Sequence, residues 1–105
     1  MGGSGMTTYY AHPPVDRFTQ SPYVTGRLRQ VAEYLERYPG LAVPDDELLA
    51  YLFLELEPTP QQRANLRKIV SRLRMVGERV GVRAKIGRIY DGVGYRYIPP
   101  DHDFF

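Results

Sequence analysis

Ten lysine and arginine side chains fall between Pro60 and Ile98, where only two acidic residues, Glu78 and Asp91, accompany them. The first 59 residues show the opposite balance, with four arginines and eight acidic residues. The formal net charge of +2 therefore hides a strongly polarised chain. Clustered guanidinium and ammonium groups supply positive charge and hydrogen-bond donors, which is the chemistry that binds the phosphates of a nucleic-acid duplex.

Arginine outnumbers lysine by twelve to two. Two explanations for this bias stay open. A GC-rich genome would produce it without any functional reason, and a phosphate-binding surface would use it because the arginine fork matches phosphate oxygens.

Other kinds of chemistry lack the residues that they need. The chain has no cysteine, and its two histidines, His12 and His102, stand near opposite ends. No catalytic triad spacing and no phosphate-binding glycine loop is present, so we expect neither an enzyme nor a cofactor. The segment 101–103 (Asp-His-Asp) would be a poor metal site, so no metal is expected. No apolar run is long enough to span a membrane and no signal peptide is visible, which predicts a cytoplasmic protein.

Apolar periodicity predicts two helices in the first half of the chain. The first runs from about Thr25 to Tyr38, with apolar residues three and four positions apart, and a short extended piece follows at Leu41–Val43. The second helix begins with three acids at residues 45–47, and its apolar side chains are Leu48, Leu49, Leu52 and Phe53. We interpret the acids as helix N-terminal charges rather than metal ligands.

The third predicted helix has the clearest start. Thr59 stands at its N-cap, Pro60 at its first position and Gln62 at the third position of a capping box. Gly81 is expected to end it. Its buried face is expected to comprise Leu66, Ile69, Val70, Leu73, Val76 and Val80.

A β-hairpin is predicted after this helix. Apolar and polar residues alternate over residues 82–90, residues 91–94 (Asp-Gly-Val-Gly) favour a turn, and residues 95–98 form the returning strand. The tyrosines at 90, 95 and 97 are expected to pack rather than to stack on bases. We divide the chain into an expression scar at residues 1–5, an N-terminal arm at 6–24, one domain at 25–98 and a tail at 99–105.

The segments Ile-Val-Ser-Arg-Leu-Arg (69–74) and Gly-Val-Gly-Tyr-Arg-Tyr (92–97) resemble the winged helix-turn-helix effector domain of OmpR/PhoB-type response regulators. The likeness covers about residues 25–98 and includes residues 37–53. It implies an α+β winged helix-turn-helix fold, with three helices followed by a C-terminal β-hairpin wing. It also implies sequence-specific binding of double-stranded DNA, with the third helix in the major groove and the wing near the minor groove.

The sequence departs from that family in four places. Residues 6–24 are too short for the four-stranded sheet that precedes the family's first helix, and no receiver domain is present. Asp91 stands where the family has a basic residue before the wing turn, and the loop at Leu54–Pro58 is short. These features suit a small stand-alone protein, such as one from a phage.

A helical wheel of the third helix places small residues, Ala64 and Ser71, in the middle of its exposed face, with cations on both sides. We predict that Arg67, Lys68 and Ser71 contact base edges and that Arg63, Arg72 and Arg74 contact phosphates. Arg79 is expected to be peripheral. In the wing, Arg83, Lys85 and Arg88 complete the predicted DNA-binding residues, and Arg83 and Lys85 should lie on the face opposite Ala84 and Ile86.

The main hypothesis is a DNA-binding transcriptional regulator. A rival hypothesis is a winged-helix interaction module that binds RNA polymerase or a repressor, and a third is a nonspecific nucleoid or recombination factor. The tyrosines of the arm and the terminal phenylalanines would suit a protein contact or a homodimer. A membrane-surface role is disfavoured because the apolar stripe of the third helix is needed to pack the other helices.

Overall fold

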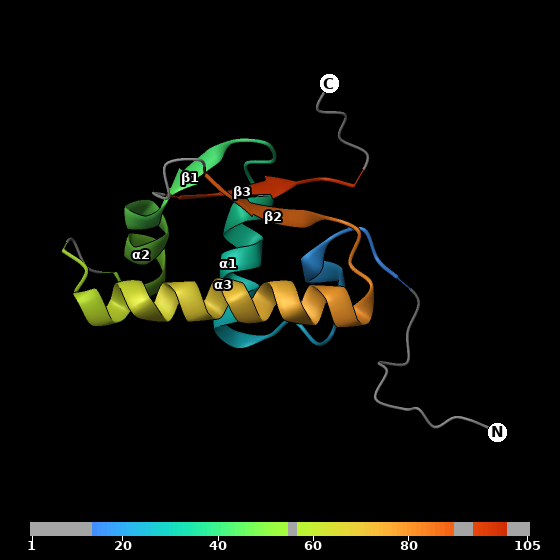
Figure 1. The fold of residues 1–105 in the computed structure, drawn as a ribbon, viewed down its shortest axis with the longest axis horizontal. Helices are drawn as coiled ribbons and strands as arrows, with labels where there is room; N and C mark the ends of the chain where they lie inside the picture. Colours follow the sequence, from blue (N-terminus) through green and yellow to red (C-terminus); the bar gives the residue numbers. More distant parts are fainter. Residues whose placement is uncertain (1–13, 55–56, 90–93, 101–105) are drawn as a thin grey trace.

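The computed structural model describes residues 14–54, 57–89 and 94–100, which form an α+β fold (Figure 1). The helices are α1 (Gly26–Glu36), α2 (Asp45–Phe53) and α3 (Pro60–Val80). The strands are β1 (Ala42–Pro44), β2 (Lys85–Arg88) and β3 (Gly94–Ile98), and a short 3-10 helix, η1 (Phe18–Gln20), precedes α1. The predicted α+β class and the order of three helices before two antiparallel strands are confirmed for this part of the chain.

The sheet contains one strand more than a hairpin. Its order is β1-β3-β2, both pairs are antiparallel, and β3 lies in the centre. The extended piece predicted at Leu41–Val43 thus becomes β1, which places Val43 opposite the buried Tyr95. Pairing with β1 satisfies backbone groups on an edge of β3 that a two-stranded hairpin would leave open. It also brings the start of α2, directly after β1, close to the sheet.

The hydrophobic core lies between the helices and the sheet. Four of the six apolar residues predicted for the buried face of α3 are buried, and Ile69 and Val76 are partly buried. Tyr95 and Tyr97 enter the same core from β3, which confirms their predicted packing role, while Tyr90 lies outside the described residues. Each large apolar side chain buried here contributes about 1.5–3 kcal/mol. The core therefore holds α3 against α1, α2 and the sheet.

The ends of α3 follow the predicted capping pattern. The Gln62 backbone N–H donates to Thr59 Oγ1 at 3.1 Å, and the Thr59 N–H donates to Gln62 Oε1 at 2.9 Å. Gly81 closes the helix with a φ of +78°. By contrast, α2 ends at Leu54 with a φ of +56°, in the left-handed region that side-chain-bearing residues rarely adopt.

Residues 14–24 differ from the arm predicted for them, because they pack on the domain. Phe18 and Val24 are buried in the core, and Val15 forms an isolated parallel bridge with Val82. The Arg83 N–H donates to the Val15 carbonyl at 2.9 Å. The residues just after α3 therefore pair with the segment around Val15, and β2 begins only at Lys85. The apolar residues of this segment have no regular spacing, so the sequence did not predict that the segment packs on the domain.

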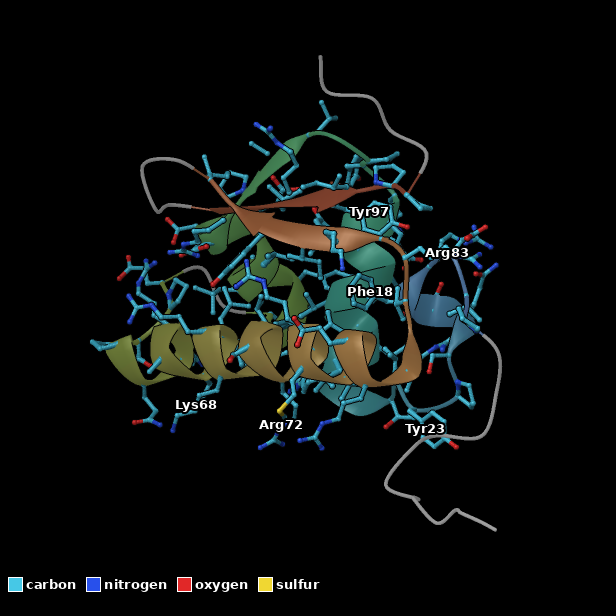
Figure 2. The ribbon with its side chains drawn as sticks, turned by 45° about the vertical axis from the view of Figure 1, so that its right-hand side comes forward. Phe18, Tyr23, Lys68, Arg72, Arg83 and Tyr97 are labelled. Carbon is cyan, nitrogen blue, oxygen red and sulfur yellow. The ribbon has the colours of Figure 1, made fainter. Side chains whose placement is uncertain are left out.

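Phe18 reaches the backbone of α3 at Gly77. A Cβ atom at residue 77 would lie 2.6 Å from a Phe18 ring carbon, which is closer than atoms can pack. Figure 2 shows Phe18 between α3 and the sheet. Gly77 has a low helix propensity and so weakens α3, but its lack of a side chain provides the space for a core aromatic ring.

Candidate nucleic-acid interface

One face of α3 carries exposed cations that form no ion pair with any acid in the described ranges. Arg67, Lys68, Arg72 and Arg79 are exposed and have no ion-pair partner in the described part of the chain, and Ser71 is exposed among them. Figure 2 shows Lys68 and Arg72 on the side of α3 that is turned away from the sheet. We call these five residues the basic face of α3. Arg79, which sequence reasoning set aside as peripheral, is part of it.

Arg74 stands two helical turns after Arg67, at the edge of this face, and it serves the fold. Its Nε donates to the Ile86 carbonyl at 2.8 Å, and its guanidinium carbon lies 5.7 Å from the centre of the Tyr95 ring. The side chain therefore connects α3 to β2 and is only partly exposed. The sequence interpretation of Arg74 as a simple phosphate contact did not include this role.

Two of the residues predicted to contact DNA form ion pairs with acidic residues of α2. Arg88 makes two hydrogen bonds to Asp45, at 3.1 and 3.2 Å, and its guanidinium carbon lies 4.4 Å from the centre of the Tyr95 ring. Arg63 pairs with Asp46 at 2.8 Å. These acids do occupy the first turn of α2, as predicted, but each also binds a cation from a later element. No sequence pattern near Arg63 or Arg88 could have predicted these two ion pairs.

The third acid, Glu47, accepts a hydrogen bond from the Tyr34 hydroxyl group. This bond is the main cause that raises the pKa of Tyr34 to about 12, and desolvation adds to it. Burial also raises the pKa of Tyr95, although the nearby Arg88 opposes the shift. Both phenols therefore stay neutral at physiological pH. No group of side chains suited to a metal ion occurs among the residues that the structure describes.

The remaining wing residues differ in their surroundings. Alternation is confirmed, because Ala84 and Ile86 are buried while Arg83 and Lys85 are exposed. Arg83 stands before β2 and pairs with Asp16 at 3.0 Å. Figure 2 shows Arg83 well away from Lys68 and Arg72. Lys85 has no ion-pair partner in the described ranges. The prediction about Asp91 falls outside the described residues.

A second surface, missed by sequence reasoning, gathers tyrosines from α1, from the turn that follows it and from α2. The Tyr34 ring centre lies 4.6 Å from that of Tyr51 and 5.4 Å from that of Tyr38. The Arg37 guanidinium carbon lies 5.8 Å from the Tyr51 ring centre and 5.9 Å from that of Tyr34. We call these four residues the tyrosine cluster. The i, i+4 spacing of Tyr34 and Tyr38 was the one local signal for it.

Comparison with known proteins found no match to this chain among family models, curated proteins or solved structures. The described helices include none whose length and apolar character would let it cross a lipid bilayer.

Proposed function

We propose that this protein is a sequence-specific, double-stranded DNA-binding regulator of transcription with a winged helix-turn-helix domain. The observation that carries the proposal is the basic face of α3, where four cations that have no ion-pair partner among the described residues share an exposed helix surface with the small side chain of Ser71. The succession of α2 and α3, followed by β2 and β3 as the wing, supports it. A helix with this composition can enter a major groove and bring hydrogen-bond donors to base edges.

Different residues would take different roles in such a complex. Arg67, Lys68 and Ser71 lie in the first half and the middle of α3, where side chains reach base edges, and Arg72 and Arg79 would hold phosphates. Lys85 would meet the backbone beside the groove. Arg74 would act through the fold, because its bond to Ile86 fixes the wing strand against α3.

The acids of α2 would oppose binding at two of the predicted positions. Arg63 and Arg88 would have to exchange Asp46 and Asp45 for phosphate before they contributed fully. The pair of Arg63 and Asp46 is exposed, and such pairs are worth about 0–1 kcal/mol, so DNA can compete with it. The pair of Arg88 and Asp45 is partly buried and has two hydrogen bonds, so Arg88 should exchange its partner less readily. The net positive charge that is available to the DNA phosphates is thus smaller than the number of cations suggests.

A protein-interaction module is the second candidate, and the tyrosine cluster favours it. Tyrosine and arginine are the residues that dominate binding energy in protein interfaces. The cluster includes the exposed Tyr38, and two further apolar side chains, Leu41 and Leu54, are 60% and 87% exposed. The partner could be RNA polymerase, a repressor or a second copy of this chain.

Binding of random duplex DNA across a salt series, followed by selection of preferred sites, tests the proposal. We expect salt-dependent binding and an enriched motif, because phosphate contacts set affinity and base contacts set sequence. Salt-dependent binding without a motif would support a nonspecific factor. Absence of binding at low salt would support the protein partner.

Matched variants sharpen this test. Arg67→Ala should cost about 1–3 kcal/mol on the selected site and relax the preference at one or two positions. Arg37→Ala removes the same charge from the tyrosine cluster at the end of α1, and it should leave the preference unchanged. Equal losses from both variants on all sequences would mean that Arg67 does not read bases.

A further inference from the structure

Met75 is the one exposed large apolar side chain of α3, a helix that the structure describes from end to end. It is 44% exposed, although contact between water and an apolar side chain is unfavourable. The side of α3 that faces the core is fixed by its buried residues, which are Leu66, Val70, Leu73, Gly77 and Val80. Successive residues of a helix are turned by about 100°, so the direction opposite to the mean of this set is that of residue 75. Met75 therefore points straight away from the core.

The neighbours of Met75 on the helix surface come from the basic face of α3. Ser71 and Arg72 stand one turn before it and Arg79 stands one turn after it. Figure 2 shows Arg72 on the side of α3 that is turned away from the sheet. The fourth neighbour, Glu78, is acidic and, like Met75, offers nothing to a phosphate group. An apolar side chain thus occupies the outermost position of a surface whose cations suit phosphates.

A helix that entered a major groove with this face would bring its outermost side chain to the base edges, while the cations on either side reached the phosphates. The base edges in that groove present hydrogen-bond donors and acceptors, and the C5-methyl group of thymine is their apolar group. We propose that Met75 contacts this methyl group and thereby makes the protein select a T·A pair at one position of its site. The inference rests on the proposed function, because it assigns a base preference to the same face of α3.

Burial of apolar surface favours thymine over the other bases. Contact between the side chain of Met75 and the methyl group removes two apolar surfaces from water. At a cytosine the same side chain would cover an amino group without offering it a good acceptor, which is unfavourable. The side chain of methionine is unbranched and has three rotatable bonds, so it can adjust to the position of the methyl group.

Single exchanges of thymidine for deoxyuridine in the selected DNA site test the proposal, because each exchange removes a methyl group and leaves every hydrogen-bonding group in place. The duplex is synthetic and contains no 5-methylcytosine, so thymine is its only source of a C5-methyl group. At one position the exchange should weaken binding of the full chain about fourfold, the effect of one buried methyl group.

Two variants provide the matched comparison. In Met75→Ala the same exchange should leave the Kd nearly unchanged, because the partner of the methyl group is absent. Leu41→Ala also truncates an exposed apolar side chain, but Leu41 lies between α1 and β1, so this variant should retain the full effect of the exchange. Alanine has the highest helix propensity, so Met75→Ala should fold, and thermal melting of each variant checks this.

Each outcome supports or overturns the inference. It is overturned if the original chain binds every deoxyuridine duplex as tightly as the thymidine site, or if Met75→Ala retains the full effect. An equal loss for Met75→Ala on all sequences would place the side chain on the sugar-phosphate backbone and would also overturn it. In these cases the protein still binds DNA, so the inference fails alone. Absence of binding to any duplex would overturn the proposed function and the inference together.

Discussion

At the scale of single residues, the hydrogen bond from Tyr34 to Glu47 makes a prediction about pH. The folded-state pKa of Tyr34 is about 12, above its ordinary value of 10.0. The neutral phenol is therefore favoured in the folded state, and this contribution to stability is fully present below pH 10 and lost as the pH rises from 10 to 12. Glu47→Gln should lower the pKa of Tyr34 toward 10.0.

Absorbance of tyrosinate during an alkaline titration measures this change. The chain has nine tyrosines, so the signal of Tyr34 must be identified. Tyr34→Phe serves as the control, because the part of the titration curve that disappears in this variant belongs to Tyr34. An identical titration curve for Glu47→Gln and the original chain would contradict the predicted role of the carboxylate.

The contact between Phe18 and Gly77 gives a second prediction at this scale. Gly77→Ala gains up to about 1 kcal/mol in helix propensity, but the added methyl group must displace a buried ring, which costs about 1–3 kcal/mol. We expect a net loss of about 1 kcal/mol in the free energy of unfolding, and chemical denaturation measures it.

A double-mutant cycle separates the two effects. In a Phe18→Leu background the ring is absent, so Gly77→Ala should become neutral or stabilising. The same destabilisation in both backgrounds would show that the ring is not the cause.

At the scale of elements, the capping box is what distinguishes the start of α3 from the start of α1. Thr59 accepts a hydrogen bond from Gln62, whereas Thr25, at the N-cap of α1, makes no side-chain capping bond. Thr59→Ala should therefore lower the free energy of unfolding by about 1 kcal/mol, which corresponds to a decrease in Tm of about 4–8 °C.

Thr25→Ala is the matched control for this prediction, because it removes an equivalent side chain from an N-cap without such a bond. Thermal melting should show a clearly smaller change for it. Equal shifts in Tm for the two variants would mean that the capping bond of α3 contributes nothing specific.

At the scale of the whole molecule, the first turn of α2 opposes the positive charge of the later elements. Asp45→Asn removes the ion pair with Arg88, which keeps its contact with the Tyr95 ring, and Asp46→Asn removes the ion pair with Arg63. If the protein binds DNA as proposed, each change should tighten binding and steepen the dependence of log K on log salt by up to about one. A binding isotherm at several salt concentrations measures both quantities.

Glu47→Gln is the control here, since it neutralises the neighbouring acid of the same turn and releases no arginine. It should change the affinity less than either aspartate variant does. If all three variants tightened binding equally, only the net charge would matter and the two ion pairs would have no separate role.

Several features of this protein could be predicted from the sequence because neighbouring residues determine them. The limits of α3 follow from Thr59, Gln62 and Gly81, and its buried face follows from the spacing of apolar residues. The exposure of Arg83 and Lys85 follows from strand alternation. Such signals act over a few positions, so periodicity and capping chemistry are sufficient to find them.

Only the tertiary structure decided which of the cations remain unpaired. Arg88 and Asp45 are 43 residues apart, and they meet because β1 pairs with β3 and so brings the start of α2 beside the sheet. Phe18 joins the core because α3 has a glycine where the ring arrives. The sequence by itself thus determined the helices, their order and the presence of a basic helix. The division of its cations between the fold and a solvent-facing surface depended on long-range packing, which no local pattern encodes.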